Sequence, residues 1–198
     1  MDIGGALSSA NLFDLIALLF LFGMFVLGYI QGTIRRILGI ASILFSFLLA
    51  GQLRDPLGSF LASNWTQFPK EYSYMLAYLF VYVFLAVLFS IIIQSFYSRQ
   101  ELFENARFAD EVIGGVLGIV QGIILIGTMI IILDSFYRIP GITKSPNELP
   151  FLRDLYTLYD PSATAALYRD TLIPALFAVL GALFPEDVRR FFPGGGAS

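Results

Sequence analysis

The stretch that most constrains this fold is residues 109–133, which read ADEVIGGVLGIVQGIILIGTMIIIL. After Asp110 and Glu111 it carries no charged side chain until Asp134. A helix rises about 1.5 Å per residue, so a run of this length can cross a hydrocarbon core of roughly 30 Å. We therefore expect a transmembrane helix over about residues 112–133.

Three further apolar runs predict spans over about residues 12–30, 37–53 and 73–97. The chain is 57% hydrophobic and only 14% charged, and its apolar blocks lack the alternation of a soluble core. These features predict an all-α membrane protein with about four transmembrane helices in a compact bundle, formed by residues 1–138. The run at 37–53 is short for a full span, and its many small residues suit close packing inside the bundle.

Glycine and proline residues indicate where the predicted helices end. Gly28 and Gly32 favour a tight hairpin after the first span, the alternative being a continuous bent helix through residues 35 and 36. Pro56 and Pro69 favour a loop over residues 54–71. The first run has no basic residue before it and is followed by an arginine pair at 35 and 36. This bias predicts that its C-terminal end is cytoplasmic and that both chain termini are extracytoplasmic.

Residues 139–198 are expected to form an extracytoplasmic, partly helical tail. Its last apolar run, residues 171–184, contains Pro174 and ends at Pro185. Fourteen residues are too few for a comfortable span, so we expect an amphipathic or membrane-lying helix there.

Two similar strings, VLGYIQGTI at 26–34 and VLGIVQGII at 116–124, predict where the first and last spans meet. Glycines four residues apart share one helix face and allow close packing in lipid. We expect the two helices to cross there, with Gln31 and Gln121 hydrogen-bonded across the contact. Alternatively, backbone carbonyls and the two glutamines line a substrate path. The glycines of this pattern are Gly28, Gly32, Gly114, Gly118 and Gly122.

Asp14 is the acidic residue within a span-like run. It follows a candidate N-cap, Asn11, so it fits a first-turn carboxylate at the membrane interface. The alternative is a proton or cation site near Asp134, which can itself pair with Arg138 four residues later.

The composition excludes several kinds of chemistry. The sequence holds no cysteine and no histidine, which removes thiol catalysis, Cys or His metal sites and His-based triads. Asp110 and Glu111 are accounted for by the favourable dipole at a helix N-terminus. The basic residues form no cluster beyond two doublets, which argues against nucleic-acid binding. We therefore predict no catalytic, cofactor-binding or metal-binding residue.

The chain resembles the colicin V production (CvpA) family of bacterial inner-membrane proteins. Two blocks carry the likeness, Asn11-Leu-Phe-Asp14 with Gly28-x-x-x-Gly32-x-x-Arg35 and Gly39, and Asp110-x-x-x-Gly114-x-x-x-Gly118-x-x-x-Gly122. Leu172-Ile-Pro174 is a weaker likeness. Many members have basic residues where this chain has Glu111 and Gln121, so the resemblance does not extend to a role that depends on positive charge there.

The resemblance implies a multi-pass inner-membrane protein that supports toxin production or export and envelope homeostasis. It implies no catalytic activity, and it suggests a membrane or envelope protein as partner alongside the lipid bilayer. The alternative is a small transporter or channel, which would have to be a homo-oligomer because four short helices make a poor pore. Some relatives anchor a serine protease domain, but this chain has no histidine to complete a triad.

Overall fold

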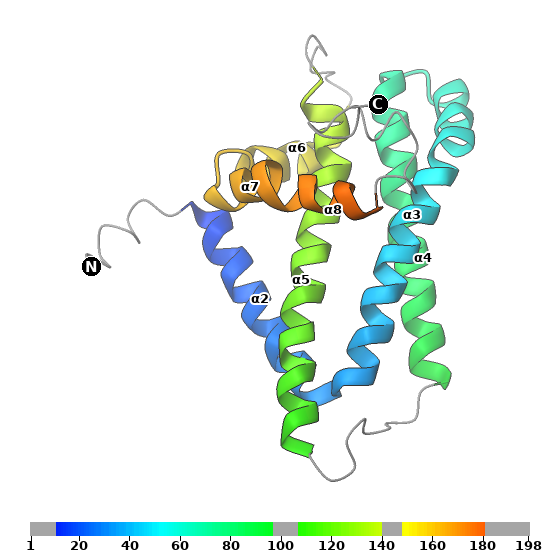
Figure 1. Cartoon of the computed structure of the whole chain (residues 1–198). Coiled ribbons are helices and arrows are strands. Elements are labelled where there is room, and N and C mark those ends of the chain that lie inside the picture. Colours follow the sequence, from blue (N-terminus) through cyan, green and yellow to red (C-terminus); the bar gives the residue numbers. More distant parts are fainter. Residues whose placement is uncertain (1–10, 97–106, 140–147, 181–198) are drawn as a thin grey trace.

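The computed structural model describes residues 11–96, 107–139 and 148–180, and these form helices and no strand (Figure 1). Four helices are long and apolar enough to cross a membrane. The expected all-α membrane fold is therefore confirmed. The long helices are α2 (Leu12–Gln31), α3 (Thr33–Asn64), α4 (Lys70–Phe96) and α5 (Arg107–Tyr137). The short ones are α6 (Pro150–Tyr159), α7 (Ala163–Leu167), the π-helix η1 (Tyr168–Leu172) and α8 (Ile173–Leu180).

The long helices pack as two pairs, α2 with α5 and α3 with α4, and the pairs meet where α5 lies against α3. Helices α2 and α3 meet at Gly32 and then diverge in a V, with α5 between them (Figure 1). They do not form the tightly packed hairpin that a turn at residues 28–32 suggests. We call this end of the bundle the Gly32 end and the opposite end, where α6–α8 lie, the tail end.

The prediction of a loop over residues 54–71 is wrong for most of that range. Helix α3 continues through Pro56 to Asn64, and α4 begins at Lys70. Packing against α4 explains this, because a Cβ on Gly58 would lie only 2.7 Å from the Tyr74 ring. These tertiary contacts offset the hydrogen bond that a proline removes from a helix interior.

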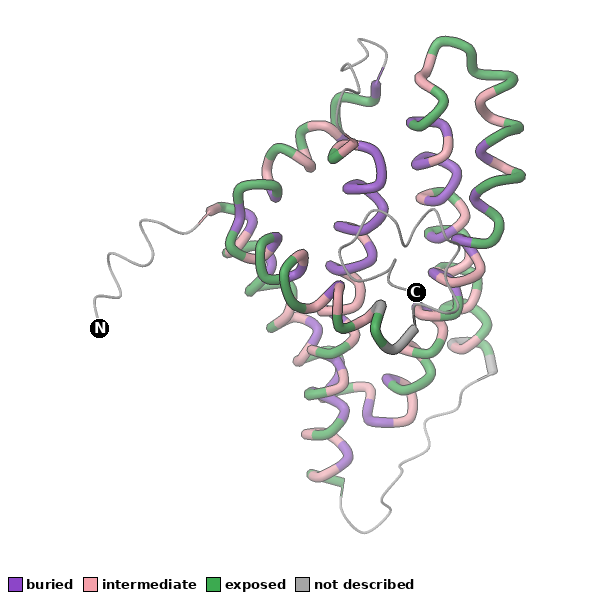
Figure 2. Tube along the Cα trace, turned by 45° about the horizontal axis from the view of Figure 1, so that its top comes forward, coloured by how far each residue is buried: buried purple, intermediate pink, exposed green. Residues whose placement is uncertain are grey.

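Buried residues concentrate on the part of α5 nearest the tail end, drawn in purple in Figure 2. Aromatic side chains from α3 and α4 complete this core, with the Phe47 and Tyr78 rings stacked 5.3 Å apart. Two tyrosines of the core form hydrogen bonds. Tyr82 Oη lies 2.8 Å from Thr128 Oγ1, and Tyr78 Oη donates to the Phe47 carbonyl at 3.4 Å.

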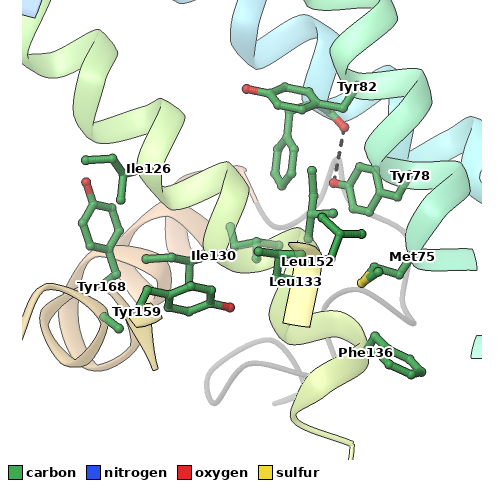
Figure 3. Close-up of a cluster of buried hydrophobic side chains, with 14 of the residues drawn as sticks. Met75, Tyr78, Tyr82, Ile126, Ile130, Leu133, Phe136, Leu152, Tyr159 and Tyr168 are labelled. Carbon is green, nitrogen blue, oxygen red and sulfur yellow. Dashed lines mark hydrogen bonds between the residues drawn. The ribbon is translucent and has the colours of Figure 1, made fainter. Parts of the chain in front are cut away.

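The tail helices lie across the bundle and pack on it rather than extending away (Figure 1). Figure 3 shows Tyr159 and Tyr168 beside α5, near Ile130 and Ile126. The helix expected at 171–184 is divided between the end of η1 and α8, which is described to Leu180. Residues 181–184 and residue 97 of the predicted elements lie outside the described residues.

Candidate functional site

Helices α2 and α5 cross in backbone contact at the Gly32 end. A Cβ on Gly28 would collide with the Gly114 carbonyl oxygen, and one on Gly118 would collide with the Met24 carbonyl oxygen. Gly122 faces side chains instead, with Leu21 Cδ2 2.9 Å from where its Cβ would be. Glycine permits this approach because a side chain at the contact would force the two backbones apart.

Asp110 joins the start of α5 to the start of α3. The Thr33 amide donates to Asp110 Oδ1 at 3.4 Å, and Thr33 Oγ1 donates to the Asp110 carbonyl at 2.9 Å. Asp110 thus acts as an N-cap for a neighbouring helix as well as a first-turn residue of its own. The interpretation based on the dipole of its own helix alone was therefore incomplete.

Gly32 is required at this junction for two reasons. Its φ of 79° lies in the left-handed region, where any residue with a Cβ atom is strained. A Cβ would also lie 2.6 Å from Asp110 Oδ2.

A cavity of about 400 Å³ adjoins this crossing and is lined by α2, α3, α4 and α5. Arg36 Nη1 donates to Gln121 Oε1 at 2.6 Å, so Gln121 bonds to α3 rather than to Gln31 as expected. Gly39 leaves room for this amide, because its Cβ would lie 2.9 Å from Gln121 Nε2. The polar residues of the lining are Gln31, Arg35, Arg36, Ser42, Ser90 and Gln121.

Asp14 lies at the opposite end, where it ties α2 to the tail. Its carboxylate completes a capping box with Asn11 and accepts from the Thr164 amide at 2.8 Å and the Ala163 amide at 3.3 Å. Those amides begin α7. This arrangement favours a structural capping role over a proton or cation site, because backbone donors already surround the carboxylate oxygens.

Asp134 is the centre of a buried ion cluster that the sequence interpretation missed. The expected contact with Arg138 is present at 3.9 Å. However, Arg169 also binds this carboxylate: its Nε donates to Oδ2 at 2.7 Å and its Nη2 donates to Oδ1 at 2.7 Å. Tyr159 Oη donates to Oδ1 at 2.8 Å. Asp134 is only 2% exposed, so these bonds satisfy a charge that water cannot reach.

The cluster shifts the titration of its tail residues. Burial alone would lower the pKa of Arg169, but hydrogen bonds to Asp134 and the charge of that carboxylate outweigh burial and raise it. Burial and the Asp134 charge raise the pKa of Tyr159. Burial and the Asp160 charge raise the pKa of Tyr156 to about 12. At neutral pH Arg169 is therefore a cation, and Tyr156 and Tyr159 are neutral phenols.

The structure gathers the sequence candidates into two groups. Asp14 lies at the tail end, and within the described ranges no group of three acidic residues is arranged to hold a metal ion. The group at the Gly32 end combines close helix packing with a cavity rich in hydrogen-bond donors. Its members are Gly28, Gln31, Gly32, Arg35, Asp110, Gly114, Gly118, Gln121 and Gly122.

Comparison with known proteins identifies a family. The sequence profile described as Colicin V production protein matches residues 13–153. This range covers nearly all of the four long helices and the beginning of α6. No match was found among curated proteins, and none among solved structures.

Proposed function

Because this chain belongs to the Colicin V production protein family, we propose that it supports toxin production or export and envelope homeostasis through partner proteins. The match over residues 13–153 carries this proposal, since it includes both the glycine crossing and Asp134. The protein acts without catalysis of its own. A sequence with neither histidine nor cysteine is consistent with that role.

The proposed partner contact is on the tail. Phe151 on α6 is 73% exposed, and Leu149 and Leu167 are also exposed. The ion cluster and Asp14 fix the tail helices on the bundle, so they would present these apolar side chains in a fixed arrangement. Exposed apolar residues on a fixed surface are suited to binding another protein.

Site-specific photo-crosslinking in native membranes tests this contact. A crosslinker at Phe151 should capture an envelope protein, and Phe151→Asp should reduce both that complex and toxin export. A crosslinker at Leu19 is the matched control, because Leu19 is similarly exposed at 71% but lies on α2. Equal protein capture at both positions, or export unaffected by Phe151→Asp, would contradict the proposal.

We propose that the Gly32 end is cytoplasmic and that the protein resides in the bacterial inner membrane. Arg35 and Arg36 follow α2, and Arg107 begins α5, so basic residues flank this end. Reporter fusions after residue 97 and after residue 138 test the orientation. A cytoplasmic reporter should be active at the first site and inactive at the second.

A second candidate function is a small oligomeric transporter or channel. The cavity between the four spans favours it, since Gln31 and Gln121 both line that space. Solute flux in liposomes that Gln121→Leu alters would support this function. Absence of flux, together with partner capture at Phe151, would support the non-transporting role.

A further inference from the structure

Arg36 carries a buried positive charge beside the cavity. It is only 4% exposed, and its one hydrogen-bonded neighbour among the described residues, Gln121, is neutral. Its Nε atom is buried and has no hydrogen-bond partner in the described part of the chain. A buried charge of this kind is costly unless an opposite charge accompanies it.

Among the residues that the structure describes, the cavity lining is positive and contains no acidic side chain. Arg35 lines the same space, so two guanidinium groups border it. The nearest acids of α5 are already engaged, because Asp110 caps α3 and Glu111 pairs with Arg107 at 3.0 Å. The described part of the lining therefore supplies no anion that would balance Arg36.

The position of the cavity indicates what could supply that anion. Helix α2 has 20 residues, about 30 Å, and Gln31 is its last residue, so the polar lining is level with lipid headgroups. Leu27 on α2 and Val87 on α4 also line the cavity and are about half exposed, at 47% and 52%. The space thus has a polar interior and an apolar opening between two spans.

We propose that this cavity binds a phosphate group, supplied by an anionic phospholipid or by a soluble phosphate. Arg36 binds the phosphate oxygens through its fork of N–H groups, and Arg35 adds positive charge. Gln31 adds a hydrogen-bond donor on the same lining. Basic pockets between spans are suited to anionic headgroups. This inference goes beyond the proposed function and does not require either transport or a protein partner.

The test uses the purified full-length protein in mixed micelles with equal amounts of phosphatidylglycerol and phosphatidylcholine of the same acyl chains. Lipid retained after gel filtration is measured by mass spectrometry. We expect preferential retention of phosphatidylglycerol, and a reduction in its affinity of about tenfold or more in Arg36→Gln, which loses charge-assisted hydrogen bonds.

Arg54→Gln is the matched control, since Arg54 is also a buried arginine of α3 but lies near the tail end, away from this cavity. It should retain phosphatidylglycerol as the unaltered protein does. If Arg36→Gln does not fold, Ser42→Leu narrows the cavity without removing charge and should also reduce retention.

A second arm distinguishes the two sources of phosphate. Inorganic phosphate is compared with chloride at equal ionic strength, and the midpoint of thermal unfolding is measured without anionic lipid. A rise with phosphate that Arg36→Gln abolishes assigns the site to soluble phosphate, whereas selective lipid retention alone assigns it to phospholipid. Equal retention of both lipids without a response to phosphate, or an equal loss in Arg54→Gln, would overturn the proposal.

Discussion

Arg169 binds Asp134 through two parallel hydrogen bonds of 2.7 Å, which join the π-helix of the tail to the end of the last span. We predict that Arg169→Met lowers the free energy of unfolding by about 3–5 kcal/mol, because it leaves a buried carboxylate without its main partner. The measurement is denaturant unfolding in detergent micelles. Adding Asp134→Asn should recover part of the loss.

Arg107→Met is the control for this prediction. Arg107 pairs with Glu111 at 3.0 Å, but its side chain is 66% exposed. An exposed pair of this kind contributes at most about 0.5 kcal/mol. A similar loss in both variants would show that burial of the Asp134 pair does not matter.

The glycine crossing predicts a graded response to alanine. Gly118→Ala should destabilise by about 3 kcal/mol, since its Cβ meets a backbone carbonyl that cannot move without separating the helices. Gly122→Ala should cost less than about 1 kcal/mol, because the Leu21 side chain can rotate away. Gly23→Ala meets no atom within 4 Å and should stabilise by about 0.5–1 kcal/mol. Thermal unfolding of the three variants checks this order.

Gly32→Ala should destabilise through both backbone strain and a clash with Asp110. We expect a loss of about 2–4 kcal/mol, of which the left-handed backbone accounts for about 1–2 kcal/mol. Asp110→Ala in the same chain removes the clash but not the strain. A double-mutant cycle should therefore show coupling of about 1 kcal/mol. Simple additivity of the two substitutions would exclude the steric part.

The packing of the tail helices on the bundle should weaken first at alkaline pH. The pKa of Tyr156 is raised to about 12 and that of Tyr159 is also raised, whereas unfolded tyrosine ionises near pH 10. Between about pH 10 and about pH 12 the folded state therefore binds more protons than the unfolded state does. Stability is fully present below about pH 10 and falls as pH rises toward about 12. Thermal unfolding from about pH 9 upward should show this fall, and Tyr156→Phe should reduce it.

Asp14→Ala should loosen α7 while leaving the spans folded. It removes the acceptor for the Thr164 and Ala163 amides, so hydrogen exchange at those amides should quicken. Asp14→Asn keeps one oxygen acceptor and should protect them better than alanine does. A cation or proton site would behave differently, because Asp14→Asn would then abolish ion transport without a change in amide exchange.

The features that the sequence predicted are those that depend on local composition. Uninterrupted apolar runs identify spans because the bilayer imposes a minimum length, and the spacing of Gly114 and Gly118 identifies a helix face. The family resemblance is confirmed by the profile match. The continuation of α3 through Pro56 and Gly58 could not be predicted, because these residues usually end helices. It depends on packing against Tyr74 of another helix, which no local pattern shows.

The ion cluster was missed for a related reason. Arg169 lies 35 residues beyond Asp134 and Tyr159 lies 25 beyond it, so no short-range pattern connects them. Arg138, four residues away, was the natural partner by helix spacing. Because Arg138 already offered Asp134 a partner, no local sign pointed to a second, distant cation.

Helix α5 contacts α2 through Gly118 and the tail through Asp134, and one continuous helix fixes the rotation between these two contacts. One inserted residue would turn one contact about 100° relative to the other. Any gain or loss of a residue between these positions would therefore misalign the last span. The number of residues between Gly118 and Asp134 is therefore constrained by the same packing that constrains the glycines.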